Sequence, residues 1–145
     1  MLLSKRIAIG FVVVMALAAI AVPPVTRAQE TAPKEGPKVV GLLFYADWCA
    51  SCKALEPKLN EVRKQLVVQP IYFTRVDMTD ESTKKQSEMF AEWVGFGEIY
   101  REHAPKTGFM LLIDPKEKKV LDKLTKTQSE AELKAAMEQA LAKTK

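Results

Sequence analysis

The feature that most constrains this chain is a pair of cysteines, Cys49 and Cys52, at the point where an apolar run gives way to a helical pattern. The run from Val39 to Tyr45 is continuous and of strand length, which is typical of a strand buried on both faces. A thiolate at a helix N-terminus is stabilised by unpaired backbone N–H groups and by the helix dipole, so Cys49 is expected to ionise readily. Cys52 lies one turn further in, within reach of a mixed disulfide on Cys49. The pair therefore predicts a redox-active dithiol.

Other functions of the pair compete with this interpretation. Cys-x-x-Cys is also half of a zinc site, but the chain has no third cysteine and a single histidine, His103, to complete one. A structural disulfide this short closes almost no loop and gains little by chain entropy. A module that binds a soft ion such as copper(I), through Cys49, Cys52 and either His103 or a nearby methionine, is the alternative from a different functional class. The spacing alone suits either exchange or metal binding.

Residues 1–28 have the layout of a signal peptide. Lys5 and Arg6 precede an uninterrupted apolar run over residues 7–22, and small residues precede a cleavage site before Gln29. The run has 16 residues, fewer than the roughly 20 of a comfortable membrane span. We expect cleavage, with an uncleaved N-terminal membrane anchor as the alternative.

The rest of the chain is expected to form a linker and one domain. Residues 29–38 are polar with two prolines and a glycine, which predicts a flexible linker. The remaining residues, 39–145, have room for a single domain. The formal net charge of the whole chain is +4, from 22 basic and 18 acidic residues. Three of the basic residues lie in residues 1–28, so residues 29–145 hold 19 basic and 18 acidic residues. Near neutrality disfavours nucleic acid as a partner. The leader predicts a periplasmic or secreted location, where disulfides persist.

Strand and helix patterns alternate along the domain. After the first strand we expect a helix containing Leu55, Leu59, Val62 and Leu66, a strand over 71–76, a helix over 80–94, strands over 109–113 and 120–124, and a helix beginning at Ser129. Pro57 is expected to kink the first helix. The helix over 80–94 is expected to turn four apolar side chains inward, namely Met89, Phe90, Trp93 and Val94.

This order of elements, with Phe44-Tyr45-Ala46-Asp47-Trp48-Cys49 followed by Cys52-Lys53, resembles the thioredoxin family over residues 39–142. The sequence around Cys49 is most similar to that of the soluble domains of periplasmic thiol–disulfide reductases. The resemblance implies an α/β thioredoxin fold, with a four-stranded mixed sheet in the order 2-1-3-4 and helices on both faces. It implies a thiol–disulfide oxidoreductase with no cofactor or metal. Its partners would be protein disulfides or dithiols, including a membrane or periplasmic redox partner.

The same resemblance assigns roles at the site. Cys49 would be the attacking thiol and Cys52 the resolving thiol, with Trp48 packed beside them. The family carries a buried carboxylate where this chain has Leu43. Glu56 follows Cys52 by four residues, so on a helix it shares a face with it. Glu56 is therefore either a substitute proton carrier or a solvated surface carboxylate.

The loop before the third strand also departs from the family pattern. The position of the family's cis-proline holds Gly108, with Thr107 before it. Thr107 is expected to pair its backbone with a partner chain, while Gly108 allows close approach. A cis bond without proline costs about 2.5–4 kcal/mol, so we expect a trans bond before Gly108. Pro105 would be the family proline only if three extra residues intervened.

Residues 95–106 make a longer connection than the minimal family has, and we expect a short extra helix there, bordering the active-site face and influencing partner choice. Phe96 and Tyr100 are expected to be packing residues. His103 is expected to be an exposed bystander, with tuning of a thiolate as its alternative role. The sequence does not indicate the direction of electron flow.

Overall fold

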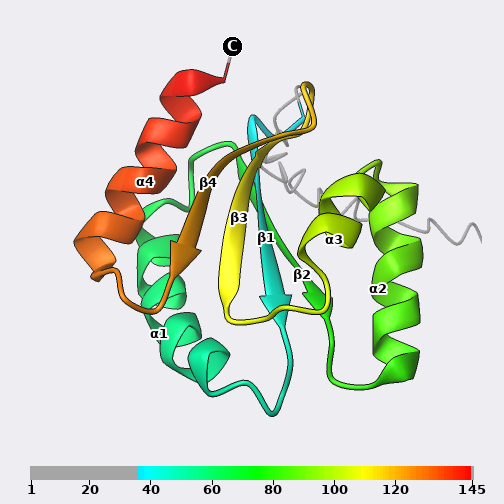
Figure 1. Ribbon diagram of the computed structural model, residues 1–145. Coiled ribbons are helices and arrows are strands. Elements are labelled where there is room, and N and C mark those ends of the chain that lie inside the picture. The colour runs from blue at the N-terminus through cyan, green and yellow to red at the C-terminus, as the bar shows by residue number, and fades with distance from the viewer. Residues whose placement is uncertain (1–35, 145) are drawn as a thin grey trace, which may run out of the picture. The chain divides into compact units, whose positions relative to one another are not determined.

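A computed structural model describes residues 36–144, so the predicted signal peptide and most of the predicted linker lie outside the described residues. The elements follow the predicted order, with the extra helix present as α3 (Figure 1). They are β1 (Val39–Tyr45), α1 (Ala50–Gln65), β2 (Ile71–Asp77), α2 (Glu81–Trp93), α3 (Gly97–His103), β3 (Phe109–Asp114), β4 (Lys119–Thr125) and α4 (Glu130–Lys143). Within residues 36–144, no helix is both long and apolar enough to cross a membrane.

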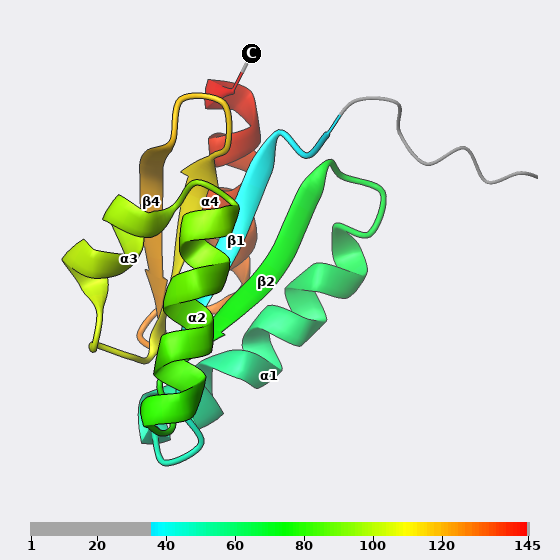
Figure 2. The same cartoon turned by 90° about the vertical axis from the view of Figure 1, so that its right-hand side faces the viewer.

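The four strands form one mixed sheet in the order β2-β1-β3-β4. β1 pairs with β2 in parallel, while β3 runs antiparallel to both β1 and β4. Helices α1 and α4 cover one face of the sheet, and α2 and α3 cover the other (Figures 1 and 2). This arrangement is the thioredoxin fold, and it confirms the predicted strand order.

β1 lies between two hydrophobic cores, which explains its unbroken apolar sequence. Leu42 and Phe44 pack in the core beneath α2 and α3, whereas Leu43 packs beneath α1 and α4. Successive side chains of a strand point to opposite faces, so a strand covered on both sides is apolar at every position. The segment that carries the two cysteines therefore begins directly at the end of a buried central strand.

The orientation predicted for α2 is wrong for two of its four apolar residues. Met89 and Trp93 are 63% and 83% exposed, while Phe90 and Val94 pack against the core. The helix instead buries Ser87 and Ala91, whose small side chains lie four residues apart on one face. Phe90 and Val94 border that face, whereas Met89 and Trp93 fall on the opposite side of the helix.

The helix ends agree with the sequence signals. Asp80 caps α2 in a capping box with Thr83, and Ser129, where the last helix is predicted to begin, caps α4 in a capping box with Glu132. Pro57 lies inside α1. The cap at Asp80 fixes the start of α2 immediately after the loop that follows β2.

Candidate redox-active site

The two cysteines lie where β1 turns into α1. The backbone N–H of Cys49 donates to Ala46 O at 3.1 Å, closing a tight turn at the end of the strand. Cys49 is the N-cap of α1, and its sulfur accepts a hydrogen bond from the backbone N–H of Cys52 at 3.1 Å. Ser, Thr, Asp or Asn oxygens usually fill this capping role. A thiolate on Cys49 would therefore be stabilised by the first turn of the helix.

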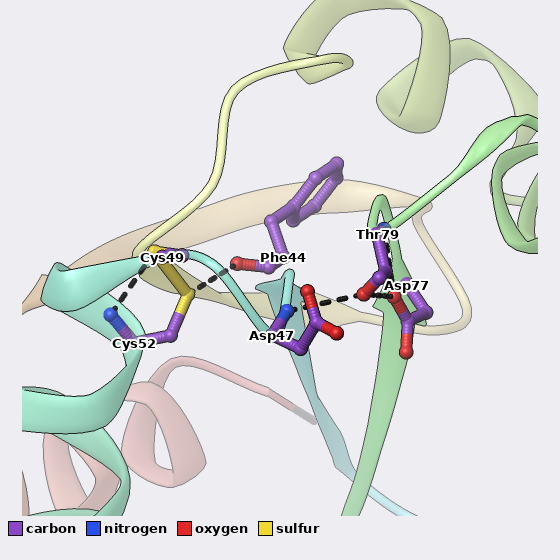
Figure 3. Close-up of a disulfide and its surroundings, with 6 residues drawn as sticks. All are labelled: Phe44, Asp47, Cys49, Cys52, Asp77 and Thr79. Carbon is purple, nitrogen blue, oxygen red and sulfur yellow. Dashed lines mark hydrogen bonds between the residues drawn. A yellow bond between two sulfur atoms is a disulfide. The ribbon is translucent and has the colours of Figure 1, made fainter.

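Cys49 and Cys52 form a disulfide, with their Cα atoms 5.3 Å apart (Figure 3). Cys52 is fully buried, whereas Cys49 keeps 6% of its surface exposed. The Cys52 sulfur lies 3.7 Å from the carbonyl oxygen of Phe44. A partner thiolate arriving from solvent can therefore reach the pair only at Cys49.

Gly108 brings the loop before β3 directly onto this disulfide. Its N–H donates to Phe44 O at 2.9 Å, and its backbone adopts φ +89°. A Cβ at this position would lie 2.6 Å from Ser51 Cβ and 3.4 Å from the Cys49 sulfur. Only glycine combines this backbone conformation with so close an approach.

The peptide bond before Gly108 is trans, as predicted. The cis bond found in residues 36–144 joins Ala104 to Pro105, three positions earlier in the same loop. Thr107 is half-buried beside Gly108. Its contact with a partner backbone remains a prediction.

Leu43, which replaces the family's buried carboxylate, is itself buried. Leu43 is 2% exposed and lies in the core beneath α1 and α4. Glu56 is half-buried on α1, one turn beyond Cys52. Burial lowers the pKa of Arg63, and the negative charge of Glu56 opposes that shift. The role of Glu56 in proton transfer remains a prediction.

A second loop supports the turn that carries Trp48, and sequence reasoning missed it. Thr79, after β2, accepts a hydrogen bond from Asp47 N at 3.1 Å and donates to Asp77 Oδ1 at 2.5 Å (Figure 3). Its carbonyl oxygen accepts from Trp48 Nε1 at 3.1 Å. Parallel pairing of the first two strands would have placed this loop next to the motif, but no sequence pattern distinguishes Thr79.

Residues 95–106, the longer connection that leads to Gly108, place apolar side chains in the core that contains Phe44 and Phe109. Phe96 and Tyr100 are 6% and 5% exposed, which confirms them as packing residues. His103 is half-buried, so its predicted exposure is wrong, whereas its predicted lack of a catalytic role stays a prediction. Its ring lies 5.8 Å from the Phe44 ring and 6.0 Å from the Phe109 ring, centroid to centroid, and its Nδ1 is 2.9 Å from Ile99 O. The histidine ring lies beside these aromatic rings because α3 ends next to β1, which carries Phe44, and β3, which carries Phe109.

Comparisons with known proteins agree with this geometry. The thioredoxin family model matches residues 28–92, which include Trp48, Cys49 and Cys52. The resemblance seen in the sequence is confirmed, and the chain carries a thioredoxin-like domain. The fold and its Cys49–Cys52 disulfide support a thiol–disulfide redox function.

Several solved structures are similar to the chain. StoA from Bacillus subtilis is 16% identical, with a TM-score of 0.49 over 72% of this chain and 85% of its own. Thioredoxin-2, a component of malaria parasite protein secretion machinery, is 21% identical, with a TM-score of 0.48 over 70% and 82%. A thioredoxin-like protein from Aeropyrum pernix is 21% identical, with a TM-score of 0.48 over 73% and 80%. A comparison with curated protein sequences gives no match.

Proposed function

We propose that the domain is a protein thiol–disulfide oxidoreductase that works through Cys49 and Cys52. The observation that carries the proposal is the disulfide itself: Cys49 caps a helix and keeps some exposed surface, while Cys52 is fully buried behind it. A nucleophile at a helix N-terminus with a resolving thiol one turn inside is an arrangement suited to exchange.

In the reducing direction, the Cys49 thiolate attacks one sulfur of a substrate disulfide. A bond forms between Cys49 and that sulfur, and the other substrate sulfur leaves as a thiolate that takes up a proton. Cys52 then loses its proton and attacks the Cys49 sulfur, which releases the second substrate thiolate. The substrate gains two electrons, and the protein ends as the Cys49–Cys52 disulfide. The reverse sequence would oxidise a partner dithiol.

Cys52 must lose its proton in a fully buried position, where a charged thiolate is poorly solvated. We propose that Glu56 carries this proton, because it lies one turn from Cys52 on the same helix and is only half-buried. Leu43 of β1, at the position of the family's buried carboxylate, offers no such group. The carboxylate would take the proton from Cys52 and pass it to solvent.

The partner is proposed to be an extended protein segment that lies across Trp48, Thr107 and Gly108. Trp48 is 61% exposed next to Cys49, and Gly108 leaves no side chain between its loop and the disulfide. We also propose that the domain works outside the cytosol, as a periplasmic or secreted protein, with a redox protein of that compartment or its membrane as partner. The leader-like composition of residues 1–28 and the cysteine pair support this location.

The test is catalysis of insulin reduction by dithiothreitol, followed through precipitation of the reduced insulin. The wild-type chain should accelerate the reaction, and Cys49→Ser should abolish the acceleration. Cys52→Ser should instead accumulate a mixed disulfide on Cys49, visible as a mass increase that dithiothreitol removes. A wild-type chain with no effect on insulin or on oxidation of a reduced protein dithiol would contradict the proposal.

A further inference from the structure

We propose that Thr79 is a positioning residue, which holds the turn bearing Trp48 so that the indole forms part of the surface that protein substrates contact. The inference rests on the proposed exchange function. It concerns the loop between β2 and α2, which supplies no reacting atom. The evidence is a chain of hydrogen bonds that joins this loop to the two residues immediately before Cys49. Figure 3 shows the bonds from Asp47 to Thr79 and from Thr79 to Asp77, and a further bond runs from Trp48 Nε1 to Thr79 O.

The direction of each hydrogen bond follows from the groups involved. A carboxylate only accepts, so the single hydroxyl proton of Thr79 is donated to Asp77 Oδ1, 2.5 Å away. The remaining lone pairs of the Thr79 oxygen then face Asp47 N–H at 3.1 Å. Donation to a negative acceptor polarises the hydroxyl and makes its oxygen a better acceptor. The side chain of Thr79 thus links the Asp77 carboxylate to the backbone of the active-site turn.

The Asp77 end of this chain is fixed by its own contacts. The buried Ser87 hydroxyl of α2 accepts from Asp77 N at 2.7 Å and donates to Asp77 O at 3.0 Å. Met78 N donates to Tyr45 O at 2.7 Å, which extends the pairing of β2 with β1. The loop between β2 and α2 is thus held by both a helix and the sheet. Thr79 can therefore restrain the turn that carries Asp47 and Trp48.

The turn itself has few internal restraints. Its one backbone closure, from Cys49 N to Ala46 O, leaves the N–H of Asp47 without a partner inside the turn. Thr79 supplies that partner through its hydroxyl, and its carbonyl oxygen accepts from Trp48 Nε1. The indole is thereby anchored at its polar edge while 61% of its surface stays exposed. A rigid aromatic face of this kind is suited to an interface, since little side-chain entropy is lost on contact.

The test compares Thr79→Val, which keeps the shape and removes the hydroxyl, with Thr79→Ser, which keeps the hydroxyl. Thr74→Val is the matched control, because Thr74 lies on β2, the strand that precedes this loop, and no hydrogen bond of its hydroxyl is found within residues 36–144. Kinetics are measured with insulin and with the small disulfide dithionitrobenzoate, both with dithiothreitol as reductant. Loss of one hydrogen bond corresponds to about a two- to tenfold effect. We expect Thr79→Val to lose this much kcat/KM toward insulin, mainly through KM, and to lose less toward dithionitrobenzoate. Thr79→Ser and Thr74→Val should match the wild type.

A spectroscopic measurement separates positioning from a general effect on the fold. The chain has two tryptophans, so Trp93→Phe leaves Trp48 as the single indole. In that background Thr79→Val should lower the fluorescence anisotropy of Trp48, and Thr79→Ser should not. If Thr79→Val does not fold, Trp48→Phe, which keeps an aromatic side chain but loses the indole N–H, should show the same selective loss toward insulin.

Two results would overturn the proposal: equal loss toward both disulfides, or unchanged insulin kinetics together with unchanged anisotropy. A wild-type chain that exchanges with neither disulfide would instead refute the proposed function.

Discussion

Replacing Gly108 by alanine should destabilise the oxidised domain. The added Cβ would lie 2.6 Å from Ser51 Cβ, an overlap with a short side chain that cannot rotate away. It would also place a side chain on a backbone with φ +89°. Both effects act on the loop that covers the disulfide.

The size of the effect follows from three contributions. The unfavourable backbone conformation costs about 1–3 kcal/mol. The steric overlap adds about 1–3 kcal/mol. The reduced freedom of the unfolded chain offsets about 0.4–1 kcal/mol of this. We therefore expect the free energy of unfolding to fall by about 3 kcal/mol.

Urea denaturation of the oxidised protein measures this change through the midpoint at constant m-value. Gly36→Ala is the matched control, because no atom lies within 4 Å of a Cβ built there, and it should change stability by less than about 0.5 kcal/mol. Gly108→Pro should be worse than Gly108→Ala, since proline fixes φ near −65° and removes the N–H that Phe44 O accepts.

A double-mutant cycle identifies the cause. Removing the Ser51 side chain with Ser51→Gly should relieve the overlap, so Gly108→Ala should cost at least about 1 kcal/mol less in that background. If Gly108→Ala is as stable as the wild type, or if its cost is the same with and without the Ser51 side chain, the steric argument is wrong.

Three further predictions concern the cysteines, Glu56 and the cap of α2. Limited alkylation of the reduced protein should label Cys49 before Cys52, and peptide mapping that finds Cys52 labelled first would reverse their assigned roles. Glu56→Gln should slow release of a mixed disulfide at neutral pH while leaving the urea midpoint nearly unchanged; an unaltered release rate would make Glu56 a surface carboxylate. Hydrogen bonds, chiefly from the Thr83 backbone, lower the pKa of Asp80, so its stabilising effect is present above its unfolded pKa and lost as pH falls through its folded pKa. Stability should therefore decline more steeply on acidification in the wild type than in Asp80→Asn, and parallel pH profiles would contradict this.

The fold could be predicted from the sequence because its signals are local and consistent. The apolar run of β1, the helix start at Ser129 and the Cys-x-x-Cys spacing each indicate the same architecture. The exposure of Met89 and Trp93 could not be predicted in this way. Helical spacing identifies stripes of residues, but the choice of the buried stripe depended on Ser87 and Ala91, whose small side chains let α2 approach β2.

The active-site cysteines could likewise be identified from their spacing, whereas Thr79 could not. Its contact with Asp47 spans 32 positions and uses a hydroxyl that any surface threonine possesses. His103 was misplaced for a similar reason, because only the path of α3 over Phe44 and Phe109 determines that its ring is covered. Contacts that depend on how two loops meet in space leave no periodic pattern in the sequence.

The carbonyl oxygen of Phe44 serves two groups at once, which links the loop above the site to the sulfur beneath it. It accepts from Gly108 N at 2.9 Å and lies 3.7 Å from the Cys52 sulfur. That sulfur carries no proton in the disulfide, but on reduction it becomes a thiol donor aimed at the same oxygen. The Gly108 amide would then share its acceptor with the newly formed thiol. Its amide proton resonance should therefore report the redox state of the buried cysteine from the surface where a partner binds.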